Sequence, residues 1–125
     1  MDLLYYHKLK MYMEKNMITL ETVEDLKTYI GKTTGQSPWI KVNQERINEF
    51  AKATEDYQWI HVNEEKAQKG IFGSTIAHGF LTLSLAPWMS YNTYEVKNIA
   101  HSVNYGLDKV RFLSPVKAGS NLRGT

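Results

Sequence analysis

The sequence predicts one α+β domain, in which a curved antiparallel sheet wraps a buried helix. Three observations support this prediction. The run from Phe80 to Met89 is apolar nearly all round, as in a helix that is buried on most sides. Short segments with helix-capping signals precede the run, and segments that alternate polar and apolar residues follow it. A chain of 125 residues also suits a single hydrophobic core.

The N-terminal part of the chain contains one segment with clear helix boundaries. Residues 1–16 carry no clear cap, and we interpret them as an N-terminal extension to a domain that spans residues 17–125. Thr22, with Asp25 three residues later, is similar to a capping box, and Gly31 is a suitable helix stop. A helix is therefore expected between Thr22 and Gly31.

An extended stretch and a second helix are expected next. Pro38 biases the residue before it away from the helical region, which favours an extended conformation over residues 37–42. Asn43 is well placed to cap a helix that ends close to Thr54. Residues 56–61 then mix aromatic and polar side chains without either regular period, which predicts an irregular loop.

The remaining elements are a short helix, the apolar helix and the strands. Asn63 is expected to cap a helix over residues 64–68. Pro87 lies late in the apolar run, where the helix is expected to weaken. Strands are expected where polar and apolar residues alternate, at 102–106, 109–113 and from 120 to 123.

Composition excludes several classes of site and partner. The chain has no cysteine, which removes disulfides, cysteine-ligated zinc, iron–sulfur clusters and thiol catalysis. Fifteen basic and thirteen acidic residues leave a net charge of +2, too balanced for nucleic acid as the principal partner. No stretch approaches the roughly 18 apolar residues of a membrane span, and no signal peptide is evident. We therefore expect a soluble, cytoplasmic protein without a membrane partner.

Asp56 and His61 are the first candidate pair. They lie five residues apart in the expected loop, which is able to turn both side chains toward one water. At neutral pH a carboxylate and an imidazole together can take a proton from water and return one elsewhere. The same two residues also fit a turn-forming Asp and a structural His, so this pattern alone leaves both interpretations open.

His78 and Gly79 are the second candidate feature. The N–H of Gly79 is expected in the first turn of the apolar helix, where amides lack partners and would stabilise an oxyanion. A plain loop-to-helix junction explains the same residues. Asp56, His61 and His78 would also supply three metal ligands, but no fixed spacing such as HExxH supports a metal site, and none is expected.

Three stretches, in this order, resemble the hydratase-2 signature and the strands that follow it in MaoC-like proteins. They are ATEDYQWIHVNEEKA (residues 53–67), GIFGSTIAHGFLTLSL (70–85) and NYGLDKVRFLSPVKAGS (104–120). Within that family the chain is most similar to the NodN-like group and to (R)-specific enoyl-CoA hydratases. The resemblance begins near Met17 and runs to the last residue.

The resemblance implies a hot-dog fold, with an antiparallel sheet around a central helix that starts near Gly79. It also implies a homodimer that binds acyl-CoA at the subunit interface. Asp56 and His61 match the family's catalytic pair, and Gly79 matches the residue whose N–H binds the thioester oxygen. The substrate-binding set implied around Gly79 and along a pocket-lining strand also includes His78, Ala77, Ile76, Asn104 and Tyr105.

The implied activity is hydration of a trans-2-enoyl-CoA to a (3R)-hydroxyacyl-CoA, with coenzyme A as carrier and no cofactor. Gln58-Trp59 replaces the Asn-Pro of many relatives, a change that the NodN-like group shares. Family members continue with further strands beyond the equivalent of Arg123, so the sheet is expected to lack its last C-terminal strands. A hot-dog acyl-CoA thioesterase and a non-catalytic acyl-CoA-binding remnant remain as alternatives. Candidate contacts to the CoA phosphates are Lys109, Arg111 and Lys117.

Overall fold

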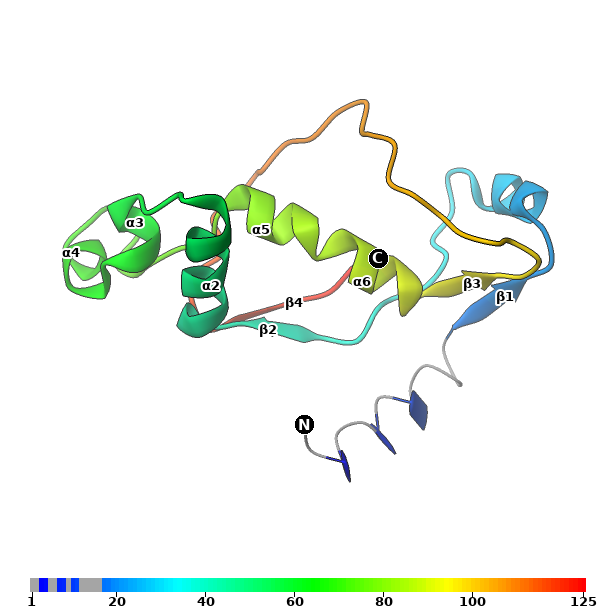
Figure 1. Ribbon diagram of the computed structural model, residues 1–125, viewed down its shortest axis with the longest axis horizontal. Coiled ribbons are helices and arrows are strands. Elements are labelled where there is room, and N and C mark those ends of the chain that lie inside the picture. Colours follow the sequence, from blue (N-terminus) through cyan, green and yellow to red (C-terminus); the bar gives the residue numbers. More distant parts are fainter. Residues whose placement is uncertain (1–2, 5–6, 9, 12–16) are drawn as a thin grey trace. The chain divides into compact units, whose positions relative to one another are not determined.

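The computed structural model describes residues 3–4, 7–8, 10–11 and 17–125 (Figure 1). The N-terminal extension expected over residues 1–16 therefore falls largely outside the described residues. The chain divides into two compact units. Unit 1 comprises Met1–Pro38, Ala86–Asp108 and Arg123–Thr125, and unit 2 comprises Trp39–Leu85 and Lys109–Leu122. Each unit combines helical segments with a two-stranded sheet, which confirms the α+β class.

Unit 1 contains the first helix that the sequence predicts. This helix, η1 (Val23–Tyr29), has the tighter 3₁₀ form. The backbone N–H of Thr22 donates to the Asp25 carboxylate at 2.9 Å, which is one arm of the expected capping box. Gly31 follows in the left-handed region, with φ at 74°, and is the expected stop.

The sheet of unit 1 differs from the predicted antiparallel arrangement. Strand β1 (Ile18–Leu20) pairs with β3 (Tyr94–Val96) in parallel, and Thr19 lies opposite Glu95. Parallel partners need a long connection, and these two strands are joined through most of the chain. Local residue patterns therefore do not predict that these two segments pair.

The sheet of unit 2 has the predicted orientation. Strand β2 (Ile40–Val42) pairs antiparallel with β4 (Ser120–Leu122), which confirms the expected extended stretch before Asn43 and the strand that starts at residue 120. Val42 is fully buried in this pair. Unit 2 thus joins residues from the middle and the C-terminal end of the chain.

Helix α2 (Gln44–Thr54) begins and ends where the sequence predicts. The Asn43 side chain accepts a hydrogen bond from the Arg46 N–H at 3.1 Å and so satisfies a free amide of the first turn. Its core-facing residues, Ile47 and Ala51, are fully buried. These contacts hold α2 in place, and the candidate site begins just after its C-terminal end.

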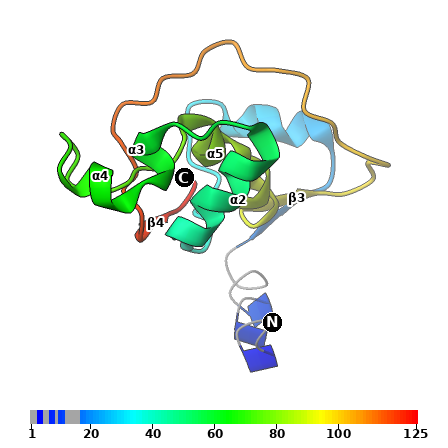
Figure 2. The ribbon, with the colours of Figure 1, turned by 60° about the vertical axis from the view of Figure 1, so that its left-hand side comes forward.

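Two short helices follow α2 and pack side by side in unit 2 (Figure 2). Helix α4 (Glu64–Gln68) is capped by Asn63, as predicted, through a 2.9 Å bond from the Lys66 N–H. The prediction of an irregular loop over residues 56–61 is wrong for its second half, because Trp59–Val62 forms α3. Packing of α3 against α2 and α4 overrides the weak local pattern.

The apolar run forms two short helices rather than one. Helix α5 (Gly79–Ser84) ends at Leu85, and α6 (Ala86–Tyr91) follows. The Leu85 N–H donates to the Thr82 carbonyl at 3.3 Å, which tightens the last turn of α5. Pro87 lacks an N–H to continue that ladder, and it is tolerated in the first turn of α6.

Burial of α5 is also less complete than the sequence predicts. Leu81 is buried, but the neighbouring Phe80 is 69% exposed. The expectation of a helix buried on most sides is therefore wrong for unit 2 as described. The reason is that the β2–β4 pair has too few strands to wrap a helix.

The predicted strands at 102–106 and 109–113 are absent from the described chain. Residues 101–113 run without regular structure, and almost all of them are exposed. Alternating polar and apolar residues favour a strand that is buried on one face. In the described chain no strand pairs with these segments, so that face is not formed. Among the described helices, none has the length and apolarity that a membrane crossing requires.

Candidate active site

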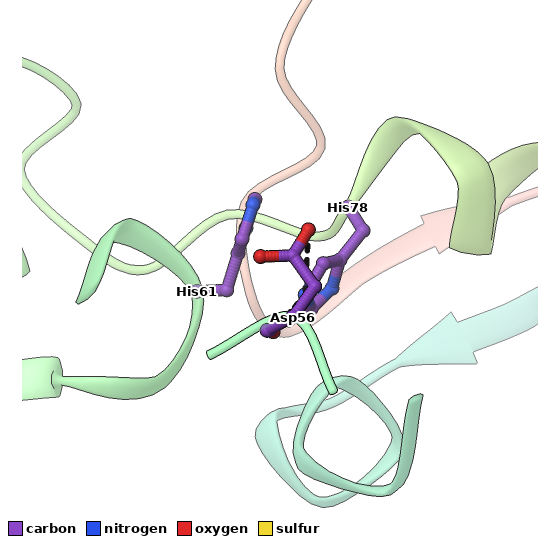
Figure 3. A group of neighbouring side chains, drawn as sticks. All are labelled: Asp56, His61 and His78. Atoms are coloured by element: carbon purple, nitrogen blue, oxygen red, sulfur yellow. Dashed lines mark hydrogen bonds and ion pairs between the residues drawn. The ribbon is translucent and has the colours of Figure 1, made fainter. Parts of the chain in front are cut away.

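Asp56, His61 and His78 gather at one place in unit 2 (Figure 3). One nitrogen or oxygen atom from each side chain lies within 4.8 Å of those of the other two. Asp56 lies just after α2, His61 lies on α3, and His78 immediately precedes α5. Both imidazoles are buried, whereas the Asp56 side chain is 53% exposed. The carboxylate therefore has access to solvent water while the rings are held in the protein.

The His61 ring has a defined orientation and a defined proton position. Its Nδ1 lies 2.7 Å from the carbonyl oxygen of Ile76. A carbonyl only accepts hydrogen bonds, so Nδ1 carries the proton, and in the neutral ring Nε2 keeps a free lone pair. The Ile76 N–H in turn donates to the Ile60 carbonyl at 3.0 Å, which holds the acceptor in place. His61 is therefore set up to accept a proton at Nε2.

The surroundings of His61 favour its neutral form. Burial lowers the pKa of His61 below its ordinary value of 6.5, and the nearby His78 lowers it further. The hydrogen bond to Ile76 and the charge of Asp56 act in the opposite direction without cancelling the effect of burial. At neutral pH the ring is therefore available as a base.

This lowered pKa makes the free energy of unfolding depend on pH. The unfolded chain binds a proton at His61 more readily than the folded chain does, so the contribution of His61 is fully present above about pH 6.5 and is lost as the pH falls through the folded-state pKa. Urea unfolding at about pH 7.5 and pH 5 should show a smaller loss of stability in His61→Gln than in the wild type. His101→Gln, at an exposed site, is the control. Equal losses in the wild type and His61→Gln would contradict the expectation.

His78 makes three contacts that tie the site together. Its Nε2 lies 3.0 Å from the backbone oxygen of Asp56 and 4.0 Å from the Oδ2 of the same residue. Its ring stacks on His61, with centroids 3.8 Å apart and an interplanar angle of 25°. The Phe50 ring packs on it in a tilted arrangement at 5.0 Å. Within the described chain, the buried Nδ1 of His78 has no hydrogen-bond partner.

The same geometry bears on metal binding. Imidazole lone pairs lie in the plane of the ring, so two stacked rings present them in nearly parallel planes and not toward one ion. A catalytic zinc site needs ligands that converge at about 2.0–2.1 Å from the metal. The stacked rings therefore do not direct their lone pairs toward a single ion, although one atom from each of the three side chains lies within 4.8 Å of the others.

A cleft of about 440 Å³ opens beside His61 in unit 2. Three other residues of the predicted substrate-binding set line it, namely Ile76, Ala77 and Gly79. A Cβ atom added at Gly79 would lie 2.6 Å from the Phe112 ring, so glycine allows this ring to close on the backbone. The sequence did not single out Phe72, Thr82 or Phe112, which also line the cleft, as does Arg111.

Two predicted substrate-binding residues lie elsewhere in the chain. Asn104 and Tyr105 belong to unit 1, on the irregular segment, and both are exposed. Their role as pocket-lining residues stays a prediction. The predicted phosphate contacts Lys109 and Lys117 belong to unit 2 and are exposed.

Gln44 supports the site and was missed by sequence reasoning. Its side-chain amide donates to the His61 carbonyl at 2.7 Å, and its oxygen accepts a hydrogen bond from the buried Thr75 hydroxyl. It thereby joins α2 to α3 and to the segment before α5. A glutamine at the first position of a capped helix carries no sequence signal for such a role.

Several known proteins are similar to this chain over most of its length. The family model described as MaoC like domain matches residues 25–125. The 3-hydroxyacyl-thioester dehydratase Z of Mycobacterium tuberculosis is 51% identical over 109 residues, which cover 87% of this chain and 72% of the relative. Nodulation protein N of Rhizobium leguminosarum bv. viciae is 49% identical over 105 residues, covering 82% of this chain and 65% of the relative.

The fold comparison agrees with the sequence matches. The structure of the R-hydratase PhaJ1 from Pseudomonas aeruginosa superposes with a TM-score of 0.57 at 23% identity, covering 70% of this chain and 55% of that one. At this identity the likeness concerns the fold. The chain thus spans between about half and three quarters of the length of these relatives.

Proposed function

We propose that this chain, which belongs to the MaoC-like family, adds water to a trans-2-enoyl-CoA to form a (3R)-hydroxyacyl-CoA. Membership of this family places the chain among hydro-lyases with the hot-dog fold. One observation supports the specific reaction most. The Asp56 carboxylate comes within 4.8 Å of the ring of His61, which lines the cleft and whose Nε2 is free to accept a proton.

The proposed reaction begins with a water held between Asp56 and His61. His61 Nε2 takes a proton from the water as its oxygen forms a bond to Cβ of the enoyl group. The double-bond electrons move toward Cα and the thioester oxygen, and the negative charge of Asp56 stabilises the imidazolium that has formed. The pair then returns a proton to Cα. Both residues end in their starting protonation states, so the net change is the addition of one water.

Gly79 is proposed to stabilise the charge on the thioester oxygen. Its N–H lies in the first turn of α5, where amides have no acceptor within the helix. Gly79 and His61 line the same cleft, so a thioester bound there can meet both residues. Removal of one comparable donor in other enzymes raises the barrier by about 3–4 kcal/mol.

The substrate is proposed to be carried by coenzyme A. Arg111 lines the cleft and supplies a positive charge that suits a phosphorylated carrier. The homodimer and the cytoplasmic location implied by the family resemblance belong to the same proposal. The (3R) configuration also derives from that resemblance, and product analysis decides it.

A hydration assay with crotonyl-CoA tests the proposal. We expect the absorbance of the enoyl thioester to fall, no free thiol to appear, and chiral analysis to give the (3R) product. Release of thiol to a thiol reagent would instead identify a thioesterase. Binding without loss of enoyl absorbance would identify a non-catalytic acyl-CoA binder, and either result would overturn the proposed hydratase.

A further inference from the structure

His78 is a buried imidazole that contacts both residues of the proposed catalytic pair as well as the Phe50 ring. Its side chain is 3% exposed, and its Nε2 lies 3.0 Å from the Asp56 backbone oxygen. That oxygen only accepts, so Nε2 carries a proton. One face of the ring stacks on His61. A single side chain therefore contacts the main chain of the carboxylate residue and the ring of the base.

Asp56 has little else to hold it. It lies in an irregular segment after Glu55, whose φ of 59° places it in the left-handed region, and its own side chain is half exposed. The carboxylate accepts a local hydrogen bond from the Gln58 N–H at 3.3 Å. The bond from His78 ties this segment to a residue 22 positions away. Loss of that bond would free the segment, and the carboxylate with it.

Packing alone is a poor reason for a histidine at position 78. Among the described residues, the buried Nδ1 atom has no hydrogen-bond partner, so no contact within them requires a second ring nitrogen. A leucine would fill a similar space against Phe50. The Nε2–H bond to Asp56 is therefore the contact that distinguishes histidine from an apolar residue at this position.

We propose that His78 is a positioning residue, which holds the Asp56 main chain and the His61 ring so that both side chains face one water. The inference rests on the proposed function, in which that water is the reactant. His78 acts through its two neighbours and takes no part in the chemical step. Its loss should therefore impair turnover much more than substrate binding or folding.

The kinetic test compares His78→Leu with His78→Gln, and uses His101→Leu as a matched control at an exposed site. His78→Leu removes the donor to Asp56 and should lower kcat about 100-fold, the size of effect expected for a misplaced reacting group, with KM within about twofold. Its melting temperature should stay close to that of the wild type. His78→Gln keeps an N–H donor at a similar reach and should recover most of kcat.

Three kinetic results would overturn the inference: wild-type kcat in His78→Leu, equal loss of kcat in the Leu and Gln variants, or a fall in kcat that follows a fall in melting temperature. If the wild type hydrates crotonyl-CoA while His78→Leu is unaffected, the proposed function stands and the role of His78 falls. A wild type that is inactive on enoyl-CoA overturns the proposed function instead.

A second measurement needs no activity and no variant. Nitrogen-15 NMR of the imidazoles in the wild-type chain reports which ring nitrogen of His78 carries the proton. The inference requires the Nε2–H form, with a proton that exchanges slowly because it is buried and bonded to Asp56. The Nδ1–H form would overturn it, whatever the enzyme assay shows.

Discussion

Replacement of His61 by glutamine is expected to lower kcat/KM for enoyl-CoA hydration about 10³-fold, within the range of a lost general base. Glutamine keeps a polar side chain of similar length, but it has no lone pair of comparable basicity at the position of Nε2. The proton of the attacking water then has no acceptor in the pair except Asp56. His61 lines the cleft, but its proposed contact is with the water and not with the thioester, so KM should change little.

The measurement is a steady-state hydration assay over a range of pH. The wild type should lose activity only at acidic pH, since burial keeps the pKa of His61 below 6.5. His61→Gln should lack this acidic limb. His101→Gln, at an exposed site of unit 1, should retain full activity. If the His61→Gln variant kept a tenth or more of wild-type turnover, His61 would not be the general base.

Asp56→Asn is expected to have an effect of similar size, also about 10³-fold on kcat/KM. Asparagine has the same shape and can keep the local hydrogen bond from the Gln58 N–H. It lacks the negative charge that orients the water and stabilises the imidazolium. Since the side chain is half exposed, the free energy of unfolding should hardly change.

Glu55→Gln is the matched control for Asp56→Asn. It removes the same charge from the neighbouring exposed residue, outside the gathered side chains, and should leave turnover intact. The pH profile adds a second test. The charge of Asp56 raises the pKa of His61, so its removal should move any residual acidic limb to lower pH. A limb that stayed in place or moved upward would show that the two residues do not interact in this way.

Local sequence signals predicted the parts of the fold that depend on neighbouring residues. Asn43 and Asn63 cap the helices that follow them, because a cap needs only its own side chain and an amide three residues later. The alternation at 102–113 failed as a signal for strands. A strand needs a second strand with which to form hydrogen bonds, and in the described chain no strand pairs with this segment.

The sequence singled out candidate site residues, but it did not predict the geometry that brings them together. Asp56 and His61 were singled out as residue types able to activate water, and the structure brings their side chains close together. Sequence reasoning expected a loop to turn them inward, whereas α3 carries His61 and packs against α2. Sequence reasoning missed Gln44 because its hydrogen-bond partners, His61 and Thr75, lie 17 and 31 residues away in the sequence.

The family, the α+β class and the capped helices could be predicted from residue identity and from close neighbours along the chain, as could the chemical types of the candidate site residues. The parallel β1–β3 pair, the proton position on His61 and the stacking of His78 became evident only from the folded chain. These features depend on contacts between residues far apart in the chain, where packing of the whole unit selects the partner. Nε2 of His61 is free because the fold places the Ile76 carbonyl against Nδ1.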